Sequence, residues 1–180
     1  MCGRYVAVAD RSKIERQFEA RPIDGEALAP DFNVAPTKKV YAVMDRHDER
    51  ELKIVRWGLI PSWAKDPKIG SRMINARLES ASSKPSFRAA WKKRRALIPA
   101  DGYYEWYAPE VGPDSPAKPA KQPYYLHPRD GSLMSMAGLY EIWRDPTVAA
   151  DDDPLAFRWT CTILTTDATD DLGRIHDRMP

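Results

Sequence analysis

Short segments rich in β-branched and aromatic residues recur along the whole chain and restrict its fold more than any other feature. They cover residues 3–9, 38–44, 51–57, 95–107, 124–127, 132–143 and 157–164. Segments of this kind, separated by turns and prolines, are typical of β-strands with short connections. They predict an α+β fold dominated by an antiparallel, barrel-like sheet with a few peripheral helices.

The segment FRWTCTIL at 157–164 alternates along the chain in the way a strand does. Its odd positions would occupy one face and its even positions the other: Phe157, Trp159, Cys161 and Ile163, against Arg158, Thr160 and Thr162. A free cysteine behaves as a small hydrophobic residue. Cys161 is therefore predicted to lie in the core.

Helices are expected at fewer places. In 10–20, Asp10 is placed to act as an N-cap, and Ile14 and Phe18 lie one helical turn apart. Residues 85–93 and 167–175 are two further helix candidates. Two stretches are predicted to be surface loops: the proline-rich 108–123, because proline fixes φ and removes a ladder donor, and the acidic 144–154.

The chain has 180 residues, of which 43% are hydrophobic and 30% are charged. This length and composition fit a single domain, residues 1–180, with a core of its own. The formal net charge of +2 neither requires nor excludes a nucleic acid partner, so any basic surface must be local. No stretch approaches the roughly 18 apolar residues of a membrane span, and the N-terminus lacks the apolar run of a signal peptide.

The chain has two cysteines, which are too few for a disulfide framework and lack the spacing of a zinc site. We therefore expect a reduced, cytoplasmic protein that holds no metal and needs no cofactor. Cys2 directly follows the initiator methionine. Once Met1 is removed, Cys2 would carry a thiol and a free α-amine on neighbouring carbons, a pair that no internal cysteine can offer.

Glu105 and His176 could each carry chemistry or be structural. By strand alternation, Glu105 shares a face with Tyr103 and Tyr107. It is either a solvated edge residue or a carboxylate whose aromatic surroundings suit it to proton transfer. Histidine is a residue type that often serves as a catalytic acid, but a lone histidine such as His176 is more often structural.

Polar and basic residues suggest contacts with an anion. Asn75 and Arg77 lie two residues apart and would project to one strand face, where an amide orients a polar group and a guanidinium holds a phosphate. Alternatively, they form an ordinary structural pair. The run WKKRR at 91–95 is either a solvated face or a patch that contacts phosphates.

Tryptophans and prolines gather at loop or loop-edge positions, among them Pro36, Trp57 and Trp63. The chain has 6 tryptophans, and most of them should fill the core. An exposed tryptophan would instead offer a surface on which nucleobases stack.

Eight motifs together resemble those of the SOS-response-associated peptidase (SRAP) family, in the family's order. They are MCGRY at 1–5, FNVAPT at 32–37, WGLIPSWA at 57–64, NARLES at 75–80, SFR at 86–88, RRALIPADGYYEW at 94–106, ILTTDA at 163–168 and IHDRMP at 175–180. The resemblance implies a β-rich α+β fold and a covalent reaction with abasic sites in single-stranded DNA. Two features depart from the family: Ala96 stands where a cysteine is common, and the sequence ends within the histidine motif, so we expect that a C-terminal segment of the domain is lacking.

The resemblance also assigns roles to individual residues. The active site would consist of the nucleophile Cys2 with Asn75, Glu105 and His176. Contacts to DNA phosphates, sugars or bases are implied for Arg4, Asn33, Pro36, Trp57, Trp63, Arg77, Arg88 and Thr165.

The chemistry of Cys2 fits this reaction. An α-amine with a pKa near 7.7–8.0 is partly neutral at physiological pH and condenses with an aldehyde, such as the ring-opened abasic sugar. The adjacent thiol can then close a thiazolidine ring, which lasts longer than an ordinary imine. His176 would promote ring opening as an acid, Glu105 would move protons at the amine, and Asn75 would hold the sugar or the amine. Lyase activity at the abasic site is a further expectation.

Two other readings remain open. One is an N-terminal-nucleophile amidohydrolase or peptidase, whose oxyanion hole usually involves an Asn-Gly step, whereas Asn75 precedes Ala76 here. The other is a single-strand-binding module without catalysis, which would leave Cys2 unused. Single-stranded DNA with abasic sites is the expected partner, bound by a monomer that associates with the nucleoid.

Overall fold

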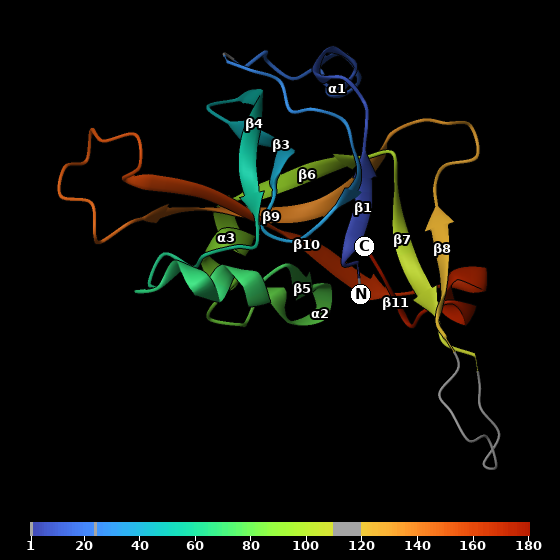
Figure 1. Cartoon of the computed structure of the whole chain (residues 1–180). Helices are drawn as coiled ribbons and strands as arrows, with labels where there is room; N and C mark the ends of the chain where they lie inside the picture. Colours follow the sequence, from blue (N-terminus) through green and yellow to red (C-terminus); the bar gives the residue numbers. More distant parts are fainter. Residues whose placement is uncertain (1, 24, 110–119) are drawn as a thin grey trace.

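The computed structural model describes residues 2–23, 25–109 and 120–180 (Figure 1). Strands dominate it, and short helices lie outside them. The strands are β1 (Arg4–Ala7), β2 (Asp31–Val34), β3 (Lys39–Arg46), β4 (Glu49–Trp57), β5 (Asn75–Arg77), β6 (Arg95–Ala100), β7 (Gly102–Tyr107), β8 (Gln122–Leu126), β9 (Met134–Arg144), β10 (Phe157–Asp167) and β11 (Arg178–Met179). The helices are α1 (Arg11–Phe18), α2 (Leu78–Ala81) and α3 (Arg88–Lys93), with 3-10 helices η1 (Pro67–Arg72) and η2 (Asp170–Arg174).

Five strands close into a barrel in the order β10–β4–β3–β6–β9, because β9 pairs with both β6 and β10. Where β9 pairs with β10, the two strand backbones come very close: a Cβ added to Gly138 would lie 2.8 Å from the Thr162 carbonyl oxygen. The pairings are antiparallel except those of β10 with β4 and with β5. The predicted α+β fold with a barrel-like, mainly antiparallel sheet is confirmed.

A second sheet, ordered β2–β1–β7–β8, packs against the barrel. The expected single strand over 95–107 is wrong, because the chain turns at Asp101 and passes from β6 of the barrel into β7 of the second sheet. The Asp101 carboxylate fixes this corner by accepting hydrogen bonds from the N–H groups of Val8 (2.7 Å) and Ala9 (3.1 Å). The corner brings β7 beside β1 and so beside the N-terminus.

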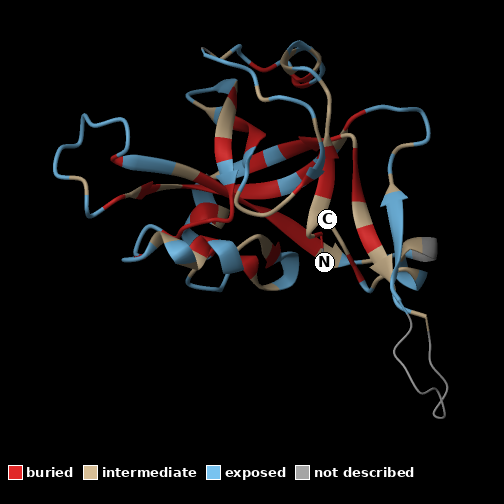
Figure 2. Ribbon diagram, in the orientation of Figure 1, coloured by how far each residue is buried: buried red, intermediate tan, exposed pale blue. Residues whose placement is uncertain are grey.

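Strand β10 is buried on both faces from residue 160 to residue 165 (Figure 2). Cys161 lies in the barrel core, as predicted. Thr160 and Thr162, which share the other face of the strand, are also fully buried. A second hydrophobic cluster, which includes Leu164 and Phe87, covers that side of the strand.

Helix α1 lies within the predicted segment 10–20, and the Asp10 side chain caps it by accepting from the Lys13 N–H at 2.7 Å. Ile14 and Phe18 are buried, as the spacing predicted. Of the predicted helix at 85–93, only Arg88–Lys93 is α-helical, as α3. Residues 167–175 contain the 3-10 helix η2 and not an α-helix, and α2 and η1 were not predicted.

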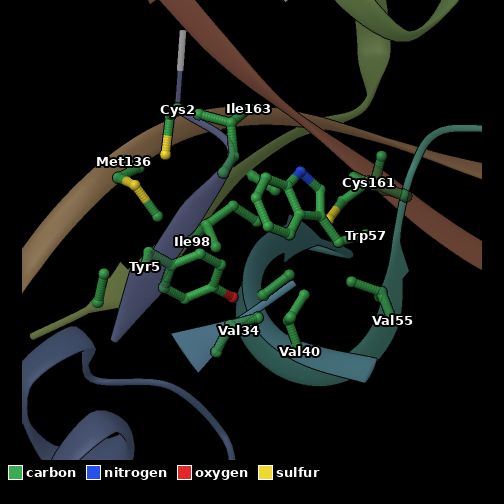
Figure 3. Packing of buried hydrophobic residues seen from close by; sticks show 14 of the residues in the cluster. Cys2, Tyr5, Val34, Val40, Val55, Trp57, Ile98, Met136, Cys161 and Ile163 are labelled. Carbon is green, nitrogen blue, oxygen red and sulfur yellow. The ribbon is translucent and has the colours of Figure 1, made fainter. Parts of the chain in front are cut away.

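The main core fills the barrel and the space between the two sheets. Figure 3 shows Tyr5 and Trp57 packed within it, with their ring centroids 5.3 Å apart. Of the predicted loop 108–123, residues 110–119 lie outside the described residues, and the last two positions are wrong because Gln122 and Pro123 belong to β8. Residues 144–154 contain a loop that joins β9 to β10. Among the described residues, no helix is long and apolar enough to cross a membrane.

Candidate functional site

Cys2 lies just before β1, and it has no exposed surface (Figure 3). Its side chain belongs to the main core cluster, together with Met136 and Ile163. Burial and the nearby Glu105 carboxylate raise the pKa of the Cys2 thiol from 9.0 to about 12. The thiol is therefore protonated at neutral pH in this structure, and it needs a proton acceptor before it can act as a nucleophile.

Asn75 is the first residue of β5, and β10 sets its position. β5 runs parallel to β10, with Asn75 opposite Ile163. From there the Asn75 amide Nδ2 donates a hydrogen bond of 2.7 Å to the backbone carbonyl of Cys2. The other amide atom, Oδ1, is buried and has no hydrogen-bond partner in the part of the chain described. Asn75 thus holds the backbone of Cys2 and keeps one acceptor available.

Glu105 lies on β7, and only 3% of its surface is exposed. The reading as a solvated edge residue is therefore wrong. As predicted, Glu105 shares the inner face of β7 with Tyr103, which is also buried. Burial, followed by the charges of Cys2 and Glu105, raises the pKa of Tyr103 to about 12. The carboxylate, the thiol and the phenol thus form one group of titratable side chains at the N-terminal end of β1.

His176 lies in the turn between η2 and β11, at the end of β10. Its Nδ1 is 2.7 Å from Asp177 Oδ1 and 3.0 Å from the Arg178 backbone nitrogen. A neutral ring that accepts the Arg178 N–H carries its proton on Nε2, whereas a protonated ring presents Nδ1–H to Asp177. The hydrogen bond from Asn75 and the charge of Glu105 both act on Cys2, whereas His176 lies in the turn beside the end of β10.

Arg178, within the motif IHDRMP, anchors this histidine segment, a role that was not predicted from the sequence. Its guanidinium pairs with both oxygens of Glu79, at 2.9 and 3.0 Å, and also contacts Asp167 and the Thr165 carbonyl. The hydrogen bond from Arg178 is the main reason that the pKa of Glu79 is lowered. These contacts tie the end of β10 to α2, which directly follows Asn75 and Arg77 of β5.

The residues predicted to contact DNA differ in their accessibility. Asn33, Trp63, Arg77 and Arg88 are exposed, Arg4 and Pro36 are partly exposed, and Trp57 and Thr165 are buried. The Trp57 indole has no exposed surface and donates to the Ile74 carbonyl at 2.9 Å, so it is a core residue and presents no face to a base. Thr165 is held against Arg178. Trp63, at 56% exposure, is placed as a stacking residue requires.

The basic run at 91–95 is only partly free to meet a phosphate. Arg94 pairs with the buried Glu141 at 2.8 Å, and Arg95 lies over the Trp91 ring. Lys92 and Lys93 are exposed at the end of α3. Across the described ranges, no three His, Cys, Asp or Glu side chains gather in a way that could hold a metal ion.

Comparison with known proteins identifies several that are similar to this chain. The family described as SOS response associated peptidase (SRAP) matches residues 1–180. The abasic site processing protein YoqW of Bacillus subtilis is 40% identical over 182 residues, which cover 100% of this chain and 75% of that protein. The abasic site processing protein HMCES of Gallus gallus is 30% identical, with 100% and 61% covered. A crystal structure of a protein from Bacteroides thetaiotaomicron superposes with a TM-score of 0.80 at 27% identity, covering 99% of this chain and 75% of that one.

Proposed function

Because the chain belongs to the SRAP family, whose curated relatives are abasic site processing proteins, we propose that it binds single-stranded DNA and reacts covalently with abasic sites through Cys2. The observation that carries this proposal is the convergence of Asn75 and Glu105 on Cys2. The hydrogen bond from Asn75 fixes the Cys2 backbone, and the Glu105 carboxylate acts on the thiol. Removal of Met1 would turn this fixed backbone nitrogen into a free amine.

The proposed reaction has two bond-forming steps. The neutral amine of Cys2 attacks the aldehyde of the ring-opened sugar, and loss of one water gives an imine. The thiol sulfur then adds to the imine carbon, while its proton leaves and the imine nitrogen gains one. The product is a five-membered thiazolidine, and its mass is the sum of both reactants minus one water.

The raised pKa of the thiol decides the order of these steps. A thiol with a pKa of about 12 supplies little thiolate at neutral pH, whereas an α-amine with a pKa near 7.7–8.0 is partly neutral. The amine therefore reacts first. Glu105 then accepts the thiol proton as the sulfur attacks, and it is the described carboxylate whose charge acts on that thiol.

Asn75 and His176 would act on the sugar. The Oδ1 of Asn75, which has no hydrogen-bond partner among the described residues, can accept from the new amine or from a sugar hydroxyl. His176 would donate a proton to the ring oxygen of the closed sugar and so favour the aldehyde. Phosphates would be held by the exposed guanidinium groups of Arg77 and Arg88, without reading of sequence.

Intact-mass spectrometry after mixing the Met1-processed protein with an oligonucleotide that contains one abasic site tests the proposal. The expected species is protein plus oligonucleotide minus one water, which persists on heating. A matched oligonucleotide with a tetrahydrofuran residue has no aldehyde and should give no adduct. Absence of the adduct from the natural abasic strand, or its persistence in Cys2→Ala, would overturn the proposed function. Hydrolysis of amide substrates that depends on Cys2 would instead support the amidohydrolase reading.

A further inference from the structure

The outer face of the second sheet carries a row of aromatic rings that the proposed reaction does not use. Tyr104 and Tyr125 have ring centroids 5.2 Å apart, and Tyr125 stacks on His127 at 4.9 Å with an interplanar angle of 19°. β8 is the edge strand of this sheet, and its residues are mostly exposed. These three side chains, called the ring row below, thus form a continuous and accessible π surface.

The strand register places the ring row on the face that points away from the barrel. Tyr5 and Tyr103 are paired across β1 and β7, and both lie in the main core. Their neighbours Arg4 and Tyr104 are also paired, so alternation directs them to the opposite face. Tyr125 is paired with Tyr104 and shares that face.

The position of the Tyr125 ring depends on Gly102. A Cβ at residue 102 would lie 2.5 Å from an atom of the Tyr125 ring, so the ring covers the glycine directly. The Tyr104 hydroxyl donates to the Phe32 carbonyl at 3.3 Å, which holds that ring across the sheet. Both rings are therefore supported from below and still expose one side, as a stacking platform must.

The charges around the ring row suit a polyanion. Arg4 is opposite Tyr104 on the same face, and the exposed Lys121 and Arg129 lie just before and just after β8. One acidic group, Asp101, acts on Tyr125. Its carboxylate already accepts two backbone N–H groups of the segment that follows β1. Cationic side chains interleaved with exposed rings are the pattern by which proteins hold single-stranded nucleic acid.

We propose that the ring row is a stacking surface for single-stranded DNA, on which unpaired bases beside the reacting nucleotide lie against Tyr125 and Tyr104. The inference rests on the proposed function, because it assigns a path to the strand that meets Cys2. β8 lies two strands from β1, which is about 10 Å at the usual strand spacing. Because Glu105 faces inward and the ring row faces outward, the DNA would pass round the end of this sheet, and nucleotides next to the reacting one would lie on the ring row. Asn33, which alternates with the buried Val34 on β2, continues the same outer face.

The test measures equilibrium binding in the Cys2→Ser background with probes that carry no aldehyde, so that no covalent step contributes. Two probes of equal length are compared: an oligothymidylate, and a strand of tetrahydrofuran residues that has phosphates and sugars but no bases. Tyr125→Leu keeps an apolar side chain over Gly102 and removes the ring. It should weaken binding of oligothymidylate about tenfold, within the roughly 5- to 150-fold range for one stacked base, and leave binding of the base-free strand unchanged. Tyr125→Phe should bind like the parent.

Tyr124 offers a matched control, since it is exposed to 43% against 41% for Tyr125 but lies on the other face of β8. Tyr124→Leu should leave the affinity for oligothymidylate unchanged. Equal losses in Tyr124→Leu and Tyr125→Leu, no loss in Tyr125→Leu, or an equal loss on the base-free strand would each overturn the stacking surface. Failure of the proposed function would appear separately, as loss of the covalent adduct with binding intact.

Discussion

The side-chain amide of Asn75 donates a hydrogen bond of 2.7 Å to the backbone carbonyl of Cys2. The two residues are 73 positions apart, and the contact exists because β5 continues along β10 where β4 ends. β4 pairs with β10 at Cys161, and β5 takes over from Ile163. The backbone of Cys2 is therefore held by a three-residue strand that is itself paired with β10 of the barrel.

Asn75→Ala should slow adduct formation about 10- to 100-fold, because small misplacements of a reacting group are costly in rate. It should lower the free energy of unfolding by only about 1 kcal/mol, the usual net value of one hydrogen bond. Single-turnover kinetics and urea denaturation measure the two effects. Asn75→Asp, which keeps the size but loses the donor, should be at least as slow. A variant of either kind with the parent's rate would show that this contact does not position Cys2.

Glu105→Gln should have two effects. The neutral amide cannot accept the thiol proton, so adduct formation should slow roughly 10²–10⁴-fold, the usual contribution of an acid–base group. The pKa of Cys2 should fall below about 12, because the negative charge that helps to raise it is gone. Ultraviolet absorbance of the thiolate during a pH titration checks the second effect. An unchanged or higher thiol pKa in Glu105→Gln would mean that the carboxylate is not the charge acting on the thiol.

The sequence predicted well what depends on neighbouring residues. The cap at Asp10 and the helix that follows it, and the burial of Cys161, are set by local spacing and by hydrophobicity. Local pattern could not show that the chain turns at Asp101, because both halves of 95–107 favour strands and the choice of sheet depends on distant partners. Nor could alternation show that Thr162 is buried, since a barrel strand can be covered on both faces.

The candidate site could be assembled only in part from the sequence. The motifs identified Cys2, Asn75 and Glu105, and the structure brings these three together. Trp57 was misassigned because a position at the end of a strand does not reveal which way the side chain points. The role of Arg178 could not be predicted because local pattern does not show that its partners Glu79 and Asp167 lie beside it in the fold.

His176→Ala should slow adduct formation roughly 10²–10⁴-fold if the ring supplies the proton for sugar opening. DNA affinity should stay nearly unchanged, because the positively charged contacts are elsewhere. Single-turnover kinetics at saturating DNA measures the rate of adduct formation. Binding to the tetrahydrofuran strand, which cannot react, measures the affinity separately. Equal losses in rate and affinity would instead make His176 a binding or structural residue.

Alkaline pH should destabilise the fold through its buried thiols. Burial raises the pKa of the Cys161 thiol above 9.0, so on a rise in pH the unfolded chain loses this proton before the folded one does. The free energy of unfolding should thus fall above about pH 9, by up to about 1.4 kcal/mol per pH unit for each such thiol. Urea denaturation between about pH 8 and 11 should show a shallower fall for Cys161→Ala, although that variant is less stable at neutral pH. If the free energy of unfolding fell with pH at the same slope in Cys161→Ala and in the parent, a buried, protonated Cys161 thiol would be contradicted.

An alanine inserted between Met1 and Cys2 tests the aminothiol directly. The thiol is retained, but the free amine moves to the preceding residue, so amine and sulfur no longer stand on adjacent carbons and the five-membered ring cannot close. Extension at a chain terminus is commonly tolerated, so the variant should fold and bind single-stranded DNA. It should form no heat-stable adduct, whereas Cys2→Ser should give at most a labile imine that borohydride traps. A stable adduct at the parent's rate, from an insertion variant whose mass shows loss of Met1 alone, would exclude thiazolidine formation.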